Sequence, residues 1–252
     1  MTYGFLPATK EEFDRSGIGV PDFVYVSGDA YVDHPSFGAA IITRILDAAG
    51  FSVAVLAQPN FRSTEDFMRY GKPRLGFLVS SGNVDSMVAH YTAAKKKRSD
   101  DWYSPGRRAG LRPDRAVIVY TNRIREAYGD IPVIIGGLEA SLRRFAHYDY
   151  WSDKVRRSIL VDSRADILSY GMGENSIRRI AELLARGVPV KKIRDVRGTA
   201  YLCRRGEKLN FDPVRGTREE PEGYDYDELK TSKAAYAAAF AEQYANNDAV
   251  NG

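Results

Sequence analysis

The densest group of chemically versatile side chains in the sequence follows two adjacent glycines, Gly136 and Gly137. Arginine forms forked hydrogen bonds with carboxylates and phosphates, and aromatic rings offer a surface for stacking. Side chains of these types, placed just beyond an apolar run, are typical of a ligand pocket or a domain interface. We therefore interpret the two glycines as candidate ligand or interface residues, together with Glu139, Ser141, Arg143, Arg144, His147, Tyr148 and Trp151.

Three further segments place polar residues or glycines directly after apolar runs. Glycine lets the backbone turn sharply and approach a ligand, and a helix that begins there offers free N–H groups to an anion. The alternative is that these glycines only end strands and that the polar side chains only satisfy turns. The candidates from these segments are Asp33, His34, Ser81, Gly171, Gly173 and Glu174. No residue is predicted to be catalytic.

The cysteine and histidine content limits the kinds of site that are expected. Cys203 is the only cysteine, so neither an internal disulfide nor a thiolate metal site can form within the chain. The three histidines are scattered, and no metal ligand is predicted. A G-x-G-x-x-G motif after the first apolar run and a G-x-x-x-x-G-K-[ST] motif are both absent, which disfavours ordinary dinucleotide and P-loop binding.

The elements that must position these residues alternate between strand and helix. Short apolar runs predict strands at 23–27, 51–57, 74–80, 132–137 and 165–171. Periodic apolar positions with capping residues and terminal glycines predict helices at 36–49, 63–70, 115–128 and 174–185, with weaker helical patterns at 83–94 and 138–145. Strand propensity competes at 116–120, but the helix is preferred because a better strand follows directly.

This alternation predicts an α/β fold with an open, mostly parallel sheet and helices on both faces, a Rossmann-like architecture. Ligands of such sheets bind beyond the carboxyl ends of the strands, where the candidate residues lie. The domain organisation expected is an irregular segment at 1–22, the Rossmann-like domain at 23–190, and a small C-terminal β and helix extension at 191–252. Within that extension we expect a hairpin that turns at Arg205 and Gly206, and a helix at 227–245.

The net charge of +4 is mild, but the basic residues are clustered. The clusters are Lys95–Arg98, Arg107-Arg108, Arg143-Arg144, Arg156-Arg157 and Arg204-Arg205. They indicate either a solvated surface or a site for phosphates or nucleic acid. No apolar stretch approaches the length of a membrane span, and the N-terminus lacks the pattern of a secretory signal. A cytoplasmic location without a membrane partner is expected.

The segment GGLEASLRRFAHYDYW, the later ADILSYGMGE and the RGTAY at 197–201 together resemble the N-terminal region of the YgiQ-type radical SAM proteins. The resemblance extends from about Leu6 to the last predicted helix. It implies that this α/β domain precedes a catalytic barrel, in which a C-x-x-x-C-x-x-C loop holds a 4Fe-4S cluster that cleaves S-adenosylmethionine. With its lone cysteine, the chain departs from that pattern. We therefore expect an accessory domain, inactive alone and without a cofactor of its own, whose partner is the missing barrel in cis and whose substrate is unknown. Such a chain is either the front part of a longer enzyme or a truncated product.

The same region is also similar to cobalamin-binding-like domains, in which a D-x-H-x-x-G motif supplies a histidine to cobalt. Asp33 and Gly38 have the spacing of that motif, but Pro35 stands where the histidine belongs and His34 is one position early. The resemblance therefore speaks against histidine-ligated cobalamin. Two alternatives stay open: a stand-alone module for a nucleotide-like or corrin-like ligand, and a basic nucleic-acid-binding domain. Nucleic acid ranks last of the partners and is not expected.

Overall fold

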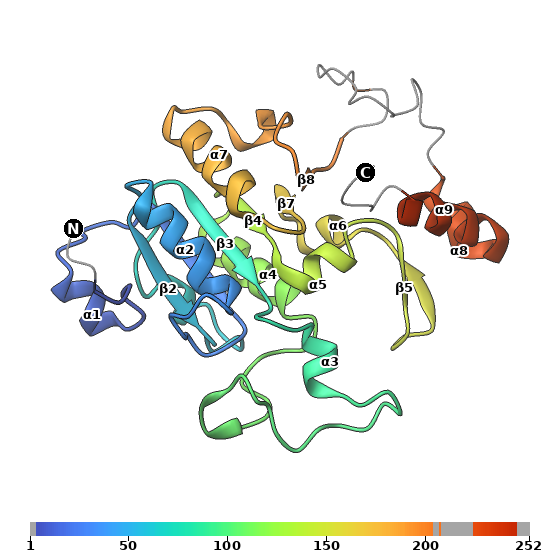
Figure 1. Cartoon of the computed structure of the whole chain (residues 1–252), viewed down its shortest axis with the longest axis horizontal. Helices are drawn as coiled ribbons and strands as arrows, with labels where there is room; N and C mark the ends of the chain where they lie inside the picture. The colour runs from blue at the N-terminus through green and yellow to red at the C-terminus, as the bar shows by residue number, and fades with distance from the viewer. Residues whose placement is uncertain (1–3, 204–206, 208–223, 246–252) are drawn as a thin grey trace. The chain divides into compact units, whose positions relative to one another are not determined.

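The computed structural model describes residues 4–203, 207 and 224–245 (Figure 1). The chain forms two compact units, which are described separately. Unit 1 comprises residues 1–144 and 159–202, and unit 2 comprises residues 145–158 and 203–252. Unit 1 contains the sheet, whereas unit 2 contains a hairpin and the last two helices.

Unit 1 is built on a six-stranded sheet with the order β2-β1-β3-β4-β7-β8. The first five of these strands are parallel, and β8 pairs with β7 in the antiparallel direction. Nearly all residues of the parallel strands are buried, as expected for a sheet covered on both faces. The strands are β1 (Phe23–Ser27), β2 (Val53–Ala57), β3 (Gly76–Ser80), β4 (Val133–Ile135), β7 (Ile167–Ser169) and β8 (Thr199–Ala200).

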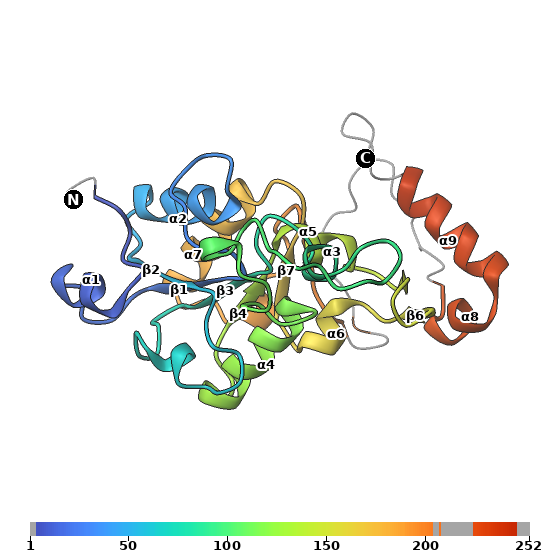
Figure 2. The ribbon, with the colours of Figure 1, turned by 90° about the horizontal axis from the view of Figure 1, so that it is seen from below.

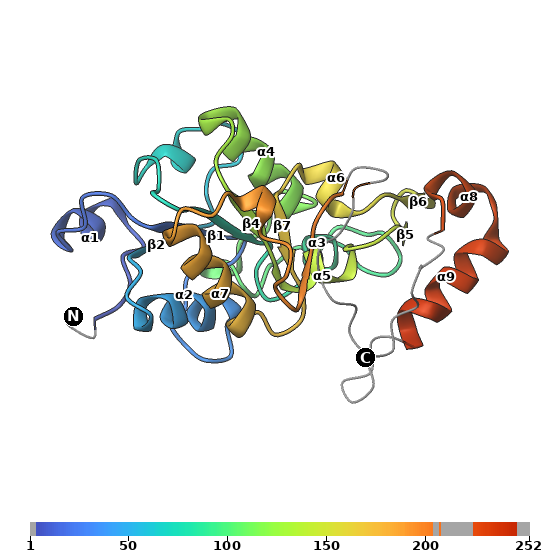
Figure 3. The same ribbon diagram turned by 90° about the horizontal axis from the view of Figure 1, so that it is seen from above.

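Helices cover both faces of this sheet, as Figures 2 and 3 show. On one face lie α2 (Gly38–Ala48) and α7 (Glu174–Ala185), and on the other lie α4 (Ala116–Tyr128) and α6 (Ile159–Ser163). Two apolar clusters result. The α2 and α7 side includes Leu46, Leu78, Ile134 and Ile180, whereas the α4 side includes Phe77, Val79, Tyr120 and Ile124. This arrangement confirms the predicted α/β fold with an open, mostly parallel sheet.

The strand order reverses at β1, which pairs with β2 on one side and β3 on the other. Loops from neighbouring strands therefore diverge at the carboxyl ends of β1 and β3, where doubly wound sheets bind ligands. Two short helices follow strands at this edge, α3 (Ser86–His90) after β3 and α5 (Gly137–Leu142) after β4.

Several elements differ from the sequence-based expectation. Residues 63–70 contribute only a single 3-10 turn, η1 (Asp66–Met68), and 83–94 contribute only α3. Residues 10–15, predicted to be irregular, form α1 (Lys10–Arg15) because Thr9 and Glu12 make a capping box. The expected hairpin near residue 200 is replaced by the pairing of β8 with β7, and its turn at 205–206 lies outside the described residues.

Unit 2 joins a short hairpin to two helices. The hairpin strands are β5 (His147–Asp149) and β6 (Lys154–Arg156), and the helices are α8 (Tyr226–Thr231) and α9 (Lys233–Ala245). The single helix predicted at 227–245 is interrupted at Ser232, whose hydroxyl accepts a hydrogen bond from the Ala235 N–H and caps α9. The Tyr226 hydroxyl donates to the Val155 carbonyl at 3.1 Å, which attaches α8 to the hairpin.

Candidate functional site

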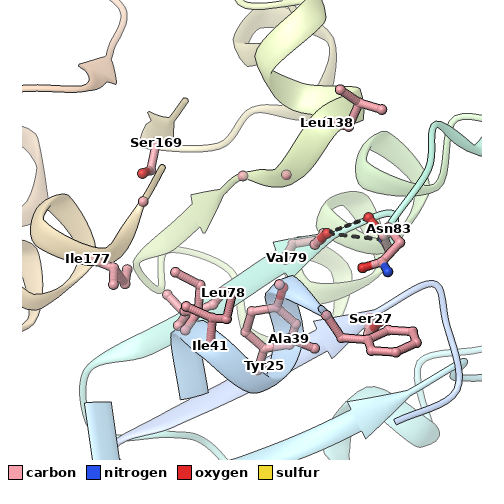
Figure 4. A pocket seen from close by; sticks show the side chains of 18 of the residues that line it. Tyr25, Ser27, Ala39, Ile41, Leu78, Val79, Asn83, Leu138, Ser169 and Ile177 are labelled. Carbon is pink, nitrogen blue, oxygen red and sulfur yellow. Dashed lines mark hydrogen bonds between the residues drawn. The ribbon is translucent and has the colours of Figure 1, made fainter. Parts of the chain in front are cut away.

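A cavity of about 340 Å³ opens at the carboxyl edge of the sheet in unit 1. It lies between the strand ends and the first turns of α2 and α7 (Figure 4). Apolar side chains from the strands and from α2 and α7 line its inner part, and the ring of Tyr25 lies among them (Figure 4). These apolar side chains are Leu78, Ile134, Ile41, Ile42 and Ile177.

A row of serine hydroxyls borders this apolar interior. Ser27, Ser80 and Ser169 are the last residues of β1, β3 and β7, and Ser27 lies beside Ser80 in the strand register. The Ser27 hydroxyl accepts a hydrogen bond from the Asp29 N–H at 3.1 Å, and that of Ser80 accepts from the Gly82 N–H at 3.1 Å. The Ser169 and Ser176 hydroxyls are 2.7 Å apart. The pocket thus presents neutral polar groups above an apolar base.

Tyr25 adds a further neutral hydroxyl to the pocket. Burial raises the pKa of Tyr25 to about 12, although a hydrogen bond with Ser80 acts in the opposite direction. The phenol therefore stays protonated near neutral pH, where it can both donate and accept a hydrogen bond.

Two glycines allow the loops at this edge to pack closely together. Gly82 has φ +104°, and a Cβ there would lie 2.0 Å from a carboxylate oxygen of Asp29. Gly137 has φ +80°, and its Cβ would lie 2.6 Å from the Ser80 hydroxyl oxygen. Because any larger residue would meet both backbone strain and a steric clash, these positions require glycine.

The acidic residue Asp29 lines the pocket, and its charge is partly offset by a buried arginine. Its carboxylate is buried, accepts a hydrogen bond from the Asn83 N–H at 2.6 Å, and lies 2.7 Å from the Arg112 guanidinium. Burial raises the pKa of Asp29, and the positive charge of Arg112 opposes that rise. Within the described residues, the lining contains no lysine or arginine, and Glu174 is its only other charged side chain. The charged groups of the lining are therefore acidic, and the charge of Asp29 is partly offset by Arg112.

Arg112 is the centre of a buried polar network. Its side chain is completely buried and contacts Asp101 at 2.7 Å, while another of its nitrogens donates to the Ser81 carbonyl at 2.9 Å. The Ser104 hydroxyl accepts from the Gln58 amide at 2.6 Å. The network attaches the residues between α3 and α4 to the ends of β1, β2 and β3.

Glu139 and Arg143, two predicted site residues, do not line the pocket. Glu139 is buried, and its carboxylate accepts hydrogen bonds from the N–H groups of Ser86 at 2.9 Å and Val117 at 3.0 Å. It thereby caps the starts of α3 and α4. Burial raises the pKa of Glu139, and the nearby Asp85 adds to the rise. Arg143 forms an ion pair with Asp85.

The other predicted residues are distributed between the pocket, the rest of unit 1 and unit 2. Gly136, Gly137, Gly171, Gly173 and Glu174 line the pocket. Of the remaining residues in unit 1, Asp33 hydrogen-bonds with Arg44, and His34 is exposed, with its Nδ1 accepting a hydrogen bond from the Ser36 N–H. The Ser81 hydroxyl donates to the Val84 carbonyl, that of Ser141 accepts from the Gly171 N–H, and the Arg144 guanidinium lies over the Tyr170 ring. The residues that belong to unit 2 are His147, Tyr148 and Trp151.

Sequence reasoning missed the residues that give the pocket its chemistry, namely Tyr25 and the three serines. A signal for them was present, because the strands predicted at 23–27 and 74–80 both end in serine, and Ser169 lies within the strand predicted at 165–171. Alternation along a strand places Tyr25 and Ser27 on the same face, so the pair could have been assigned together. The role of Arg112 had no comparable signal.

Comparison with known proteins identifies the family. The sequence matches the family model described as radical SAM N-terminal over residues 5–252. The chain belongs to this radical SAM N-terminal family. The resemblance predicted from the segment after Gly136 is thereby confirmed.

The curated relatives of this radical SAM N-terminal chain are UPF0313 proteins. One from Clostridium botulinum is 55% identical over 98% of this chain, which spans 38% of that protein. One from Geobacter sulfurreducens is 53% identical over 94% of the chain and 38% of its own length. One from Pseudomonas aeruginosa is 59% identical over 79% of the chain and 27% of its own length. The chain thus spans between 27% and 38% of the length of these relatives.

Among solved structures, the radical SAM methyltransferase TsrM from Kitasatospora setae, determined with cobalamin and a 4Fe-4S cluster bound, aligns with a TM-score of 0.47. The identity is 19%, and the alignment covers 74% of this chain and 28% of that one. Within residues 4–203, 207 and 224–245, no group of three or more histidine, cysteine or acidic side chains could hold a metal ion. No helix in the same residues is long and apolar enough to cross a membrane.

Proposed function

We propose that this radical SAM N-terminal domain is an accessory ligand-binding domain that works with a catalytic barrel in the same polypeptide. The observation that carries the proposal is the cavity of about 340 Å³ at the carboxyl edge of the sheet. The size lies within the range of small-molecule pockets, and the position is where doubly wound sheets bind their ligands. The greater length of the UPF0313 relatives supports a second domain in cis.

The sulfur content of the chain supports an accessory rather than a catalytic role. In the family, a 4Fe-4S cluster held by three cysteine thiolates supplies the electron for cleavage of S-adenosylmethionine. Cys203 is the single cysteine of the 252 residues and is exposed, so the residues of this chain do not fit such a cluster. We therefore assign the chemical step to the rest of the full-length protein and ligand binding to this domain.

The lining favours an uncharged ligand portion with a flat apolar body. Aliphatic side chains form the inner walls, while Tyr25, Ser27 and Ser80 offer neutral hydrogen-bonding groups at the border. The charge of Asp29 is only partly offset by Arg112, and the lining that the structure describes offers no cation to a phosphate. A fused heterocycle, such as the base of a nucleotide-like or corrin-like ligand, fits this chemistry better than a phosphate group does.

Histidine-ligated cobalamin does not fit the residues present. His34 is exposed, is not part of the pocket lining, and uses its Nδ1 to accept a hydrogen bond from the Ser36 N–H at 3.1 Å. Pro35 has no atom that could bind cobalt, and Asp33 is engaged with Arg44. Any corrinoid would therefore have to bind without a protein ligand on the cobalt from this segment.

The mouth of the pocket is the part that we assign to the barrel contact. Leu138 and Met172 line the pocket yet are 46% and 85% exposed, and Leu142 on the same helix as Leu138 is 61% exposed. Apolar side chains gathered at a pocket mouth are costly in water and mark an interaction surface. Covering them with the barrel would also shield the bound ligand from water.

Calorimetry with adenosine, S-adenosylmethionine and cobalamin tests the pocket directly. Ala39 lines the cavity from the first turn of α2, so Ala39→Trp should fill it, whereas Ala48→Trp at the exposed end of the same helix should not. We expect at least one of the three compounds to bind the wild-type chain and the Ala48 variant but not the Ala39 variant. Absence of binding for all three, or equal binding by both variants, would refute the pocket as a ligand site.

A further inference from the structure

Residues 91–110, which follow α3, form a distinct feature that we call the basic arm. The arm has internal backbone pairing of its own. Tyr91 pairs with Lys97 and Asp100 pairs with Arg108 through antiparallel bridges, which close two turns of the chain at 91–97 and 100–108. The first turn is also fixed by the Thr92 N–H donating to the Lys96 carbonyl at 2.9 Å. The arm thus holds its side chains in defined positions.

The arm concentrates positive charge on the surface of unit 1. Its exposed cations are Lys95, Lys96, Lys97, Arg98, Arg107 and Arg108. Of its two acidic residues, Asp101 is buried against Arg112, so only Asp100 remains partly exposed. Lys96, Lys97, Arg107 and Arg108 form no ion pair with any residue that the structure describes. With six cations and two acidic residues, the arm alone carries a formal charge of +4, equal to the net charge of the whole chain.

An aromatic ring lies among these cations. Trp102 is 69% exposed, and the Arg107 guanidinium lies 3.8 Å from the centre of its ring. A large apolar ring left this exposed is costly in water, and the arginine orients it by a cation–π contact. An oriented indole surrounded by cations can stack on a base while its neighbours contact phosphates.

The arm is fixed to the same sheet edge as the pocket. Arg112, which follows the arm in the sequence, contacts both Asp101 of the arm and Asp29 of the pocket at 2.7 Å. The Tyr103 carbonyl accepts a hydrogen bond from the Ala30 N–H at 2.9 Å, and the Tyr103 ring lies 6.4 Å from that of Phe37, which lines the pocket. Burying the charges of Arg112, Asp29 and Asp101 costs free energy, and what this attachment achieves is to fix the position of the arm relative to the sheet edge.

We propose that the basic arm binds single-stranded nucleic acid, with bases stacking on Trp102 and phosphates contacting the cations of the two turns. An acidic protein partner would use the cations but would have no need of the exposed indole. A membrane surface would need more apolar side chains than the single ring that the arm presents. Cations on both sides of an aromatic ring instead match the alternation of phosphate and base in a single strand.

Fluorescence anisotropy of labelled oligouridylate and oligothymidylate with the complete 252-residue chain tests the proposal. We expect binding at low salt that weakens steeply as salt rises. For Lys96→Gln/Lys97→Gln the slope of log affinity against log salt should fall in magnitude by about 1.4, the value for two lost phosphate contacts on a single strand. Trp102→Leu should weaken binding roughly tenfold because base stacking is lost. Comparing the two oligonucleotides distinguishes RNA from DNA.

Lys191→Gln/Lys192→Gln provides a matched control, because it removes the same charge from exposed residues of η3 (Val190–Lys192) in the same unit. We expect this variant to bind like the wild-type chain. In a Trp151→Phe background, quenching of the remaining Trp102 emission should accompany binding. Absence of binding at low salt, an equal loss in the control, or equally tight arm-dependent binding of polyglutamate would overturn the proposal.

Discussion

Replacing Arg112 by methionine should be among the most damaging single substitutions in unit 1. The guanidinium is completely buried, lies 2.7 Å from both Asp29 and Asp101, and donates to the Ser81 carbonyl at 2.9 Å. Methionine has a similar length but no charge, so the substitution leaves two carboxylates buried without a counterion. Removing one partner of a buried ion pair typically costs about 3–5 kcal/mol.

The effect should depend on pH in a defined direction. The pKa of Asp29 is already raised by burial, with Arg112 opposing the rise, so loss of Arg112 raises the pKa further. Protonation of the Asp29 carboxylate at mildly acidic pH then relieves part of the unpaired charge. The loss in free energy of unfolding should therefore be larger at neutral pH than at acidic pH. Adding Asp29→Asn and Asp101→Asn to Arg112→Met should recover part of the loss at neutral pH.

Urea denaturation and limited trypsin digestion measure these consequences. Because Arg112 attaches the basic arm to the sheet, its loss should expose Lys95–Arg98 to faster cleavage. Arg178→Met is a suitable control, since Arg178 is an exposed residue paired with Glu182 and should contribute less than about 1 kcal/mol. An Arg112 variant as stable and as protease-resistant as the control would refute the assignment of Arg112 as the attachment of the arm.

The remaining predictions concern Glu139, Gly137 and Leu138. Burial raises the pKa of Glu139, so its contribution to the free energy of unfolding is present below its unfolded pKa and is lost as pH rises through the folded value. Glu139→Gln should flatten this decline when the free energy of unfolding is measured by urea titration across pH. Parallel pH profiles for the wild type and the variant would contradict the prediction. Gly137→Ala should lower the free energy of unfolding by about 1–3 kcal/mol, because φ is +80° and the new Cβ would lie too close to the Ser80 hydroxyl. Gly171→Ala, also at positive φ but with open space around it, should lower it less, and thermal or urea unfolding measures both. In the full-length protein, Leu138→Asp at the pocket mouth should make the domain more accessible to protease without changing the stability of the isolated chain; unchanged digestion would argue against the barrel contact.

The parts of the fold that follow from local pattern could be predicted from the sequence. β1 and α7 have the predicted bounds, because an unbroken apolar run and a regular amphipathic face each carry their own signal. The choice of a helix over a strand at α4 was also correct, since Tyr120 and Ile124 lie one turn apart on its buried face. The position of the pocket at the carboxyl edge follows from the topology alone.

The chemistry of the site was less accessible, because it depends on which distant residues meet. Glu139 and Arg143 have residue types suited to a ligand, but the folded chain uses them to cap α3 and α4 and to pair with Asp85. Arg112 lies in a segment that is basic and rich in glycine and proline, features typical of an exposed loop, yet it is completely buried. Sequence reveals the charge of such residues, whereas only the fold reveals their partners.

The accessory role can be tested by the yield of 5′-deoxyadenosine from the purified 252-residue chain after iron–sulfur reconstitution, with S-adenosylmethionine and a strong reductant. Because Cys203 is the only cysteine, we expect a colourless protein and no product above that of the reagents alone. A brown, cluster-containing chain that forms 5′-deoxyadenosine by itself would contradict the assignment of this domain to an accessory role.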